Sequence, residues 1–310
     1  MKLSIVVPVF NGEKFIEETL NSVIRNTQNL QAEIIVVNDG SKDQTSFVLD
    51  KFANRVKLIE QENSGEAAAV NSGIRASESE FTLILSADDL CPEPELFLEA
   101  FKVFRSSPDV QCVYPDWKMI NEKGEVIHTI QTQDFSYIRM LENFDCLPGP
   151  GSIFRTESFR VVGGRDVKVK FLSDYEFWLR LGQVGAFKRI PRNLAYWRSH
   201  PESTTIKQRS LSMALERIQV MENFFQLNPQ LDQYKNKSMS NVFYSCALMS
   251  YYSKGIPAKQ FLLRSVFKEP TSIFRRNFLQ VSFILLVPIS KLGLSSFLTL
   301  KSSMKRLVRL

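Results

Sequence analysis

The chain has 310 residues, of which 44% are hydrophobic and 23% charged, an ordinary composition for a globular protein with one large domain and a smaller one. Its four cysteines are scattered without a Cys-x-x-Cys pair, which argues against a zinc site or a disulfide framework and favours a reducing compartment. The net charge of +6 is uneven, because residues 254–310 hold 11 Lys and Arg and one acidic residue, whereas the first 253 residues carry a net −4.

The first apolar run is short and ends at Pro8, which argues against a signal peptide and predicts a cytoplasmic protein. The basic C-terminal end favours an anionic partner surface, such as the inner face of a membrane, met peripherally. Nucleic acid is not an expected partner, since no recognised reading motif accompanies the basic residues.

In the first 90 residues, apolar β-prone runs alternate with helical patterns. The predicted strands cover residues 3–9, 33–37, 56–60 and 81–85. The predicted helices contain residues 15–24, 43–52 and 67–74, and a further helix covers 94–104. Such alternation indicates βαβ units, and therefore an α/β fold with a mostly parallel sheet flanked by helices.

The pattern changes after Pro108. Residues 110–120 and 125–130 predict a hairpin, because a turn sequence separates two strand-like runs. A short strand over 153–155, a helix over 174–181 and a last strand pair over 187–197 follow.

Strand signals end near Thr205, so we expect one domain over residues 1–205 and a basic α-helical region over 206–310. Helices are predicted over 210–227, 231–253, 258–267 and 274–287, and the apolar run in the last one is too short to span a bilayer. Two interpretations of this region stay open: a basic amphipathic helix on a membrane surface, or a helical cap on the first domain.

Two adjacent carboxylates, Asp88 and Asp89, follow the predicted strand over 81–85. Ligands of open α/β sheets bind outside the carboxyl ends of the strands, and a divalent cation held there can neutralise a phosphorylated substrate. The alternative is that both residues only cap the next helix.

Six stretches together resemble the inverting glycosyltransferases of the large family 2, which have the GT-A fold and use nucleotide-diphospho-sugars. They are residues 7–11 (VPVFN), 37–41 (VNDGS), 63–65 with 69–73 (NSG, AVNSG), 86–89 (SADD), 173–178 (SDYEFW) and 196–200 (YWRSH). Each is short, but they occur in the family's order and usual spacing over residues 1–205.

The resemblance implies a site for a UDP- or dTDP-sugar. The backbone of Pro8, Val9, Phe10 and Asn11 would line the base pocket, unless these residues form an ordinary turn. Asp39 would accept the N–H of a uracil or thymine edge, although it could instead cap the next helix. Gly65 would let the nucleotide approach the backbone.

The resemblance also implies Mg²⁺ or Mn²⁺ as cofactor. Asp88 would face the ribose and the metal, Asp89 would bind the cation that bridges the diphosphate, and His200 would approach the same ion. Arg198 suits a bidentate phosphate contact. Many family members have an aspartate where this chain has Ser86, and a surface-loop histidine is the alternative for His200.

Asp174 is the candidate general base. An inverting transfer needs a carboxylate that takes the proton of the acceptor hydroxyl as its oxygen attacks the anomeric carbon. The family often has an acidic pair here, whereas this chain has Ser173 before Asp174, and helix capping is the alternative role. Glu176 is a second candidate, but two residues further along a helix it faces elsewhere.

We therefore expect a metal-dependent inverting hexosyltransferase that acts on a glycan or lipid-linked acceptor in cell-surface polysaccharide synthesis, with the acceptor entering across residues 145–166. The alternative function is a catalytically inactive nucleotide-sugar-binding or assembly module, which the departures at Ser86 and Ser173 would favour. A dehydrogenase is disfavoured, because no GxGxxG loop follows the first strand.

Overall fold

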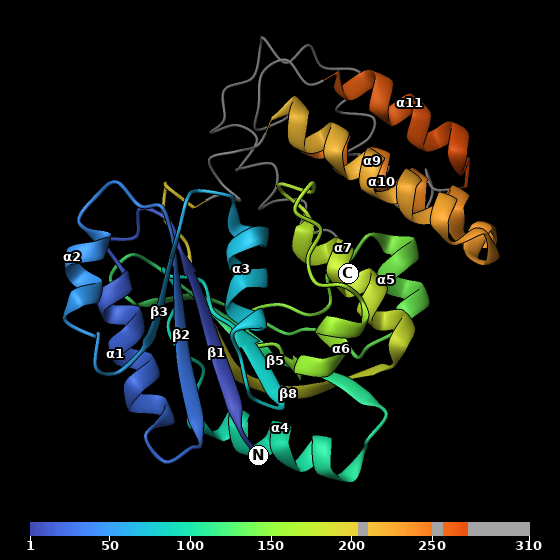
Figure 1. Ribbon diagram of the computed structural model, residues 1–310. Helices are drawn as coiled ribbons and strands as arrows, with labels where there is room; N and C mark the ends of the chain where they lie inside the picture. Colours follow the sequence, from blue (N-terminus) through green and yellow to red (C-terminus); the bar gives the residue numbers. More distant parts are fainter. Residues whose placement is uncertain (204–209, 250–256, 272–310) are drawn as a thin grey trace.

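The computed structural model describes residues 1–203, 210–249 and 257–271. Within these residues, eight strands form one mixed sheet in the order β3-β2-β1-β4-β7-β5-β6, with β8 paired to β5 (Figure 1). The strands are β1 (Leu3–Val9), β2 (Ala32–Asp39), β3 (Lys57–Gln61), β4 (Phe81–Ile84), β5 (Val110–Ile120), β6 (Val126–Ile130), β7 (Ile153–Arg155) and β8 (Ala186–Arg198). Strands β1 to β4 pair with one another in parallel. Strand β7 lies between β4 and β5 and pairs antiparallel with both.

Helices cover both faces of the sheet because the central strands are apolar on both sides. One face packs against α1 (Ile16–Thr27), α2 (Thr45–Asp50) and α4 (Pro94–Ser106). The other packs against α3 (Glu66–Arg75), α5 (Tyr137–Asn143), α6 (Thr156–Val161) and α7 (Ser173–Val184). In β1, Val7 faces the first layer and Val6 the second, as the period of two requires. Gly73 lets α3 approach β1 closely, since a Cβ there would lie 2.4 Å from Val6 Cγ1.

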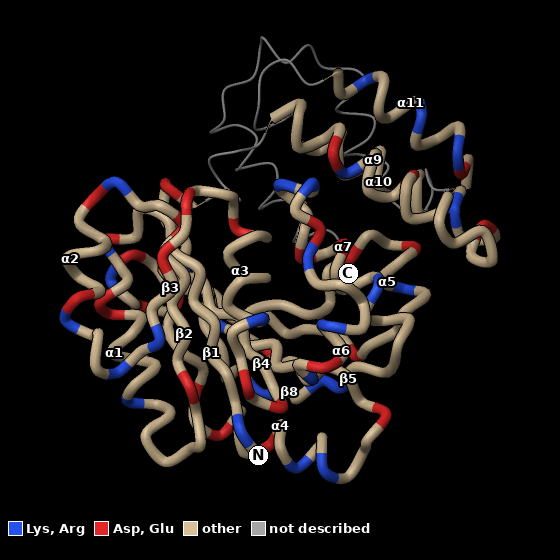
Figure 2. Tube along the Cα trace, in the orientation of Figure 1, with Lys and Arg blue, Asp and Glu red and all other residues tan. Residues whose placement is uncertain are grey.

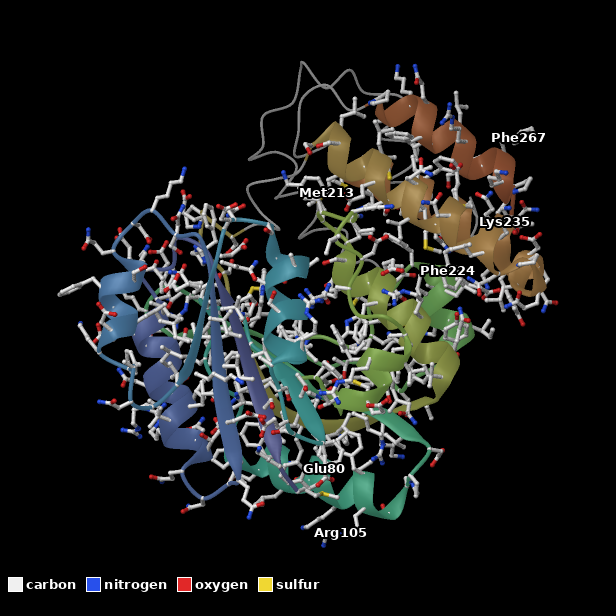
Figure 3. All side chains as sticks on the ribbon, in the orientation of Figure 1. Glu80, Arg105, Met213, Phe224, Lys235 and Phe267 are labelled. Carbon is white, nitrogen blue, oxygen red and sulfur yellow. The ribbon has the colours of Figure 1, made fainter. Side chains whose placement is uncertain are left out.

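The helical region consists of α9 (Leu211–Leu227), the 3₁₀ helix η1 (Pro229–Tyr234), α10 (Lys235–Met249) and α11 (Ala258–Lys268). Side chains of α9 and α10, among them Met213 and Phe224 in Figure 3, belong to the same apolar cluster as α5 and α7. Polar contacts reinforce this packing: Ser238 donates to the carbonyl of Leu141 at 2.8 Å. The core is therefore continuous from the sheet layer into the helical region.

The observed elements confirm the α/β fold, the mostly parallel sheet and the C-terminal helices, with three local differences. The predicted last strand pair is wrong, because residues 186–198 form one strand parallel to β5. Ile190 and Asn193 pair with two consecutive residues of β5, Pro115 and Asp116. Pro191, which has no N–H to donate, therefore lies in a bulge and not in a turn. Helix α10 begins at Lys235 after the 3₁₀ turn, later than predicted, and α5 and α6 had no predicted counterpart.

The helix predicted over 274–287 lies outside the described residues. Among the described residues, no helix combines the length and the apolar character needed to cross a membrane.

Candidate functional site

The loops that follow β1 and β2 are tied together at the carboxyl edge of the sheet, which faces the top of Figure 1. Asn11 adopts a left-handed backbone conformation with φ of 52°. Its N–H donates to Ser41 Oγ at 2.9 Å, and its Oδ1 accepts the N–H of Lys42 at 2.8 Å. Phe10 is half exposed beside it, whereas the Val9 side chain is buried in the core and Pro8 is part of β1. Phe10 and Asn11 are therefore the exposed members of this predicted group, and Pro8 is partly buried.

Asp39 holds the loop between β3 and α3. Its Oδ1 accepts from Gln61 Nε2 at 2.7 Å and from the N–H of Ser64 at 2.9 Å, and its Oδ2 accepts the N–H of Gly65 at 2.8 Å. Gly65 has φ of 88° at the start of α3, and a Cβ there would meet open space. The structure thus gives the Asp39 carboxylate the task of fixing the Gly65 loop, a role that its place in the sequence did not reveal.

Asp88 and His200 form a direct pair at the end of β4. Asp88 Oδ2 lies 2.8 Å from His200 Nε2, and a third of the Asp88 side chain is exposed. The His200 ring packs on Phe15 at 4.8 Å between centroids. Its Nδ1 is one of the few buried polar side-chain atoms, within the described residues, that have no hydrogen-bond partner.

Asp89 lies beneath this pair and is 4% exposed. Its Oδ1 accepts the backbone N–H of Arg198 at 2.6 Å. Burial and the neighbouring Asp88 charge raise the pKa of the Asp89 carboxyl well above its ordinary value.

These positions fit a divalent cation only in part. The carboxylate of Asp88 and the imidazole of His200 lie in contact, and a partly exposed carboxylate such as that of Asp88 is a donor that suits Mg²⁺ or Mn²⁺. Asp89, the third predicted ligand, is turned toward the β8 backbone instead. In the described ranges, no three His, Cys, Asp or Glu side chains come together as a preformed metal cluster.

Arg198 disagrees with the predicted phosphate contact, because its side chain is 0% exposed. Its guanidinium donates to the carbonyls of Asp88 at 2.6 Å and Glu122 at 2.9 Å and to the Glu18 carboxylate at 2.9 Å. The same group packs over the Phe15 ring at 4.9 Å. Arg198 therefore fastens β8 to the Asp88 turn and to α1, and Nε, Nη1 and Nη2 of its guanidinium all donate hydrogen bonds within the protein.

Asp174 stands in the first turn of α7 with its side chain open to solvent. Its Oδ1 accepts the N–H of Tyr175 at 2.7 Å. Protein nevertheless surrounds the group and raises the pKa of the Asp174 carboxyl, while the charge of Arg165 opposes the rise and that of Glu66 adds to it. Asp174 is therefore accessible to solvent and lies close enough to Arg165 and Glu66 to feel their charges.

Cys146 lies close to Asp174. It is also exposed, and enclosing protein together with the Asp174 charge raises the pKa of the Cys146 thiol well above its ordinary value. Cys146 belongs to the 145–166 segment, so this segment and Asp174 lie close together.

Arg165 is the main residue that the sequence did not single out. It is 7% exposed, and its Nη1 donates to Glu66 Oε1 at 2.8 Å. Asn71 clamps its backbone: Asn71 Nδ2 donates to the Arg165 carbonyl at 2.8 Å, and Asn71 Oδ1 accepts the Arg165 N–H at 2.9 Å. A buried cation is thus held between the start of α3 and Asp174. Asn71 thus supports the loop that carries Arg165.

Comparison with known proteins gives a consistent result. Residues 4–163 match the family model described as glycosyl transferase family 2. An uncharacterised glycosyltransferase of Haemophilus influenzae is 30% identical over 210 residues, which cover 66% of this chain and 70% of that protein. A chondroitin synthase of Escherichia coli is 26% identical over 77% of this chain and 35% of its own length. The chain covers 35% and 65% of two uncharacterised rickettsial glycosyltransferases, from Rickettsia conorii and Rickettsia typhi.

Solved structures show the same fold. TarS of S. aureus in complex with UDP is 18% identical with a TM-score of 0.54, over 89% of this chain and 92% of that one. The mannosyltransferase PcManGT of Pyrobaculum calidifontis, in complex with GDP-Man and Mn²⁺, is 16% identical with a TM-score of 0.55, over 91% and 78% of the two chains. At these identities the likeness concerns the arrangement of the backbone.

Proposed function

Because the chain belongs to glycosyl transferase family 2 and has the GT-A fold, we propose that it transfers a hexosyl group from a nucleotide-diphospho-sugar to an acceptor hydroxyl with inversion. The observation that carries the proposal is the solvent-exposed Asp174 carboxylate in the first turn of α7, whose pKa the surrounding protein raises. A base in that setting reaches a substrate hydroxyl, and its raised pKa strengthens it as a proton acceptor.

The transfer itself needs one displacement. The acceptor oxygen forms a bond to the anomeric carbon while the bond from that carbon to the diphosphate breaks. The nucleoside diphosphate leaves with the electron pair, and the hydroxyl proton passes to Asp174. No covalent enzyme intermediate is required.

The donor would lie along the carboxyl edge formed by the loops after β1, β2 and β3. Phe10 and Asn11 would border the base, and the Gly65 loop that Asp39 holds would border the ribose side. We propose a UDP- or dTDP-sugar, with its base next to the segment that Asp39 fixes. TarS with UDP-GlcNAc supports a uridine nucleotide, whereas PcManGT with GDP-Man is the competing precedent.

Asp88 and His200 would hold a Mg²⁺ or Mn²⁺ ion, and Asp89 would support them from beneath through its bond to the Arg198 backbone. When bound, the cation supplies positive charge that neutralises the diphosphate leaving group. The two residues orient each other through their 2.8 Å contact.

The acceptor would enter past Cys146 toward Asp174. We propose a glycan or lipid-linked acceptor in cell-surface polysaccharide synthesis, supported by the matches to proteins named hyaluronan synthase and chondroitin synthase. Free cysteines in the described part of the chain agree with a cytoplasmic location for the reaction.

The test is a panel of nucleotide-sugars with Mn²⁺ or with EDTA, read as release of nucleoside diphosphate, on wild type, Asp174→Asn and Glu176→Gln. Wild type should release UDP or dTDP only with metal, and Asp174→Asn should lose ~10²–10⁴-fold in rate while still binding the donor. Glu176→Gln is the matched control, because Glu176 is paired with Arg180 at 2.5 Å. Equal turnover by wild type and Asp174→Asn would refute the assigned base, and metal-dependent binding without turnover would favour the binding module.

A further inference from the structure

Helix α11 has an outer face that the rest of the described chain leaves uncovered. Its inner face, with Phe261, Leu262 and Ser265, is buried against α10. Leu263 and Phe267 point the other way and are 64% and 84% exposed. Residues four apart are neighbours on a helix, so these two form one apolar ridge.

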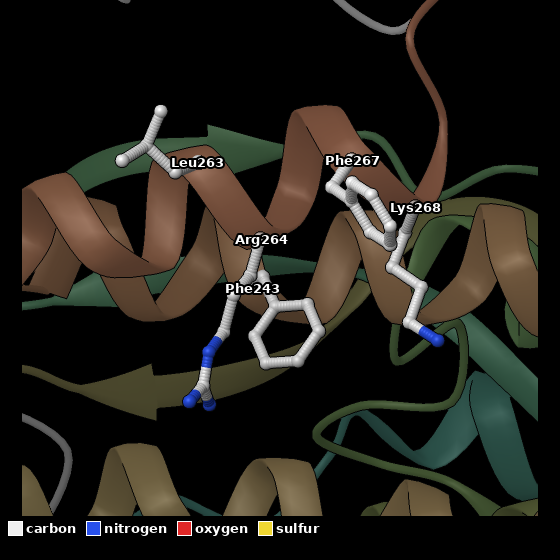
Figure 4. A pocket seen from close by; sticks show the side chains of 5 residues that line it. All are labelled: Phe243, Leu263, Arg264, Phe267 and Lys268. Atoms are coloured by element: carbon white, nitrogen blue, oxygen red, sulfur yellow. The ribbon is translucent and has the colours of Figure 1, made fainter.

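A shallow pocket of about 490 Å³ accompanies this ridge (Figure 4). Phe243 of α10 contributes a buried ring, Leu263 and Phe267 contribute apolar walls, and Arg264 and Lys268 stand at the edges. The Arg264 guanidinium lies 5.8 Å from the centroid of the Phe243 ring. The pocket is therefore apolar in its interior and cationic at its rim.

The charge of this helix has one sign. Residues 257–268 contain Lys259, Arg264 and Lys268 and no acidic residue, and Figure 2 shows the basic positions along α11. Long basic side chains keep their ammonium or guanidinium groups at a polar surface while their stems lie on apolar surface. An apolar ridge flanked by cations matches the two layers of a lipid surface, apolar chains below and anionic headgroups above.

We propose that the outer face of α11 docks the protein on an anionic membrane surface, with Leu263 and Phe267 inserted and Lys259, Arg264 and Lys268 at the headgroups. In Figure 1, α11 lies on the side to which the carboxyl ends of β1 and β2 point, so docking turns the candidate site toward the membrane. The proposal concerns binding alone and does not rest on the proposed transfer reaction.

Vesicle flotation of the full chain tests the proposal without any sugar substrate. The probes are phosphatidylcholine vesicles with and without about 30% phosphatidylserine, a content that sets a surface charge able to attract basic side chains. Wild type should float with the anionic vesicles, should float much less with neutral ones, and should be released as salt screens the attraction. Leu263→Glu/Phe267→Glu should lose at least about tenfold in partitioning, since it places charge in the apolar layer. Lys259→Gln/Lys268→Gln should also lose about tenfold or more in partitioning, because fewer positive charges attract the helix to the anionic headgroups.

Two controls match these changes. Phe47→Glu alters a side chain that is 65% exposed on α2, and Lys102→Gln/Arg105→Gln removes two charges from α4, whose Arg105 lies at the far end of the molecule in Figure 3. Both should bind vesicles within about twofold of wild type, because surface attraction falls off within a Debye length. Circular dichroism and the milder Leu263→Gln/Phe267→Gln variant separate loss of binding from loss of fold.

Unchanged vesicle binding by both Leu263/Phe267 variants would overturn the proposal, as would equal binding of wild type to neutral and anionic vesicles. A wild-type dimer that these variants convert to monomer, with no vesicle binding by either, would assign the face to a second copy of the chain instead.

Discussion

The carboxylate of Glu216, in α9, accepts the backbone N–H of Leu172 at 3.0 Å, two residues before Asp174. It also accepts the N–H groups of Phe171 at 2.6 Å and Lys170 at 2.9 Å. These donors belong to the loop that leads into α7, and a carboxylate near a helix N-terminus is favourable to the helix dipole. The helical region thus fixes the segment that carries the proposed base.

Removing this carboxylate should affect both stability and turnover. Glu216→Ala leaves three backbone donors without their acceptor, and we expect a loss of about 1–3 kcal/mol in the free energy of unfolding. Displacement of Asp174 should lower kcat by up to about 10²-fold with a smaller effect on donor binding. Denaturant unfolding and initial rates measure the two effects. Glu222→Ala, at an exposed position of the same helix, should change neither.

Removing the charge of Arg165 should shift the pH dependence of transfer. Enclosing protein raises the pKa of the Asp174 carboxyl, and Arg165 partly offsets this rise. Arg165→Met should therefore raise that pKa further, so the acid limb of kcat/KM moves to higher pH. Arg165→Lys should keep the limb near its wild-type position, and Arg75→Gln, on the exposed part of α3, serves as the control. If the acid limb of kcat/KM stays at its wild-type pH in Arg165→Met, the charge of Arg165 does not lower the pKa of Asp174.

The two histidines of the chain provide a matched test of the metal site. His200→Gln should raise the Mn²⁺ concentration needed for half-maximal activity about tenfold or more, as loss of a ligand or its orienting partner commonly does. It should also weaken metal-dependent nucleotide binding measured by calorimetry. His128→Gln, on the exposed strand β6, should leave both quantities unchanged. Equal Mn²⁺ requirements for the two variants would remove His200 from the site.

Asp116 should contribute stability that depends on pH. Burial alone would raise its pKa, but the bonds from Arg189 and Thr132 outweigh burial and lower the pKa of the Asp116 carboxyl. A depressed pKa in the folded state means that the contribution is present above the pKa of the unfolded chain and is lost as pH falls through the folded-state value. Asp116→Asn should cost about 1–3 kcal/mol at neutral pH, since it removes the charge-assisted bonds that the partly exposed Arg189 donates to the buried Asp116 carboxylate, and should flatten the acid part of the stability curve.

The comparison for that prediction is Asp134→Asn. Asp134 lies 3.8 Å from the same Arg189, but its side chain is 92% exposed. Its pair should therefore be worth no more than about 1 kcal/mol, as is usual for exposed ion pairs. Urea unfolding of both variants at several pH values measures the two losses in the free energy of unfolding. Equal losses would show that burial of Asp116 does not strengthen its pair with Arg189.

The sequence predicted the first half of the fold well because local signals and tertiary context agree there. The run Leu3–Val9 is β-branched and becomes a strand buried on both faces. The region 186–198 failed for the opposite reason: a strand pair was expected over 187–197, whereas the partner strand β5 carries the chain past Pro191 with a register shift. A bulge depends on the partner, which sequence spacing does not name.

The residues of the candidate site likewise fall into those that the sequence predicted and those that long-range contacts determine. Asp88 and His200 were predicted together from two separate motifs, and the structure places them in contact. Arg198 belongs to one of these motifs, yet its complete burial depends on acceptors more than 70 residues away. Arg165 and Glu216 carry no local signal at all, since their partners Glu66 and Leu172 lie 99 and 44 residues away in the chain.

The continuous core has a consequence for biosynthesis. Met213 and Phe224 belong to the same apolar cluster as Tyr175 and Phe177, so a nascent chain that has emerged only to residue 205 still exposes the apolar sides of α5 and α7. Strand β5 likewise waits for β8, because Val110 pairs with Ala186. Until α9 and α10 leave the ribosome, the partly made protein carries the exposed apolar surface that recruits chaperones and favours aggregation.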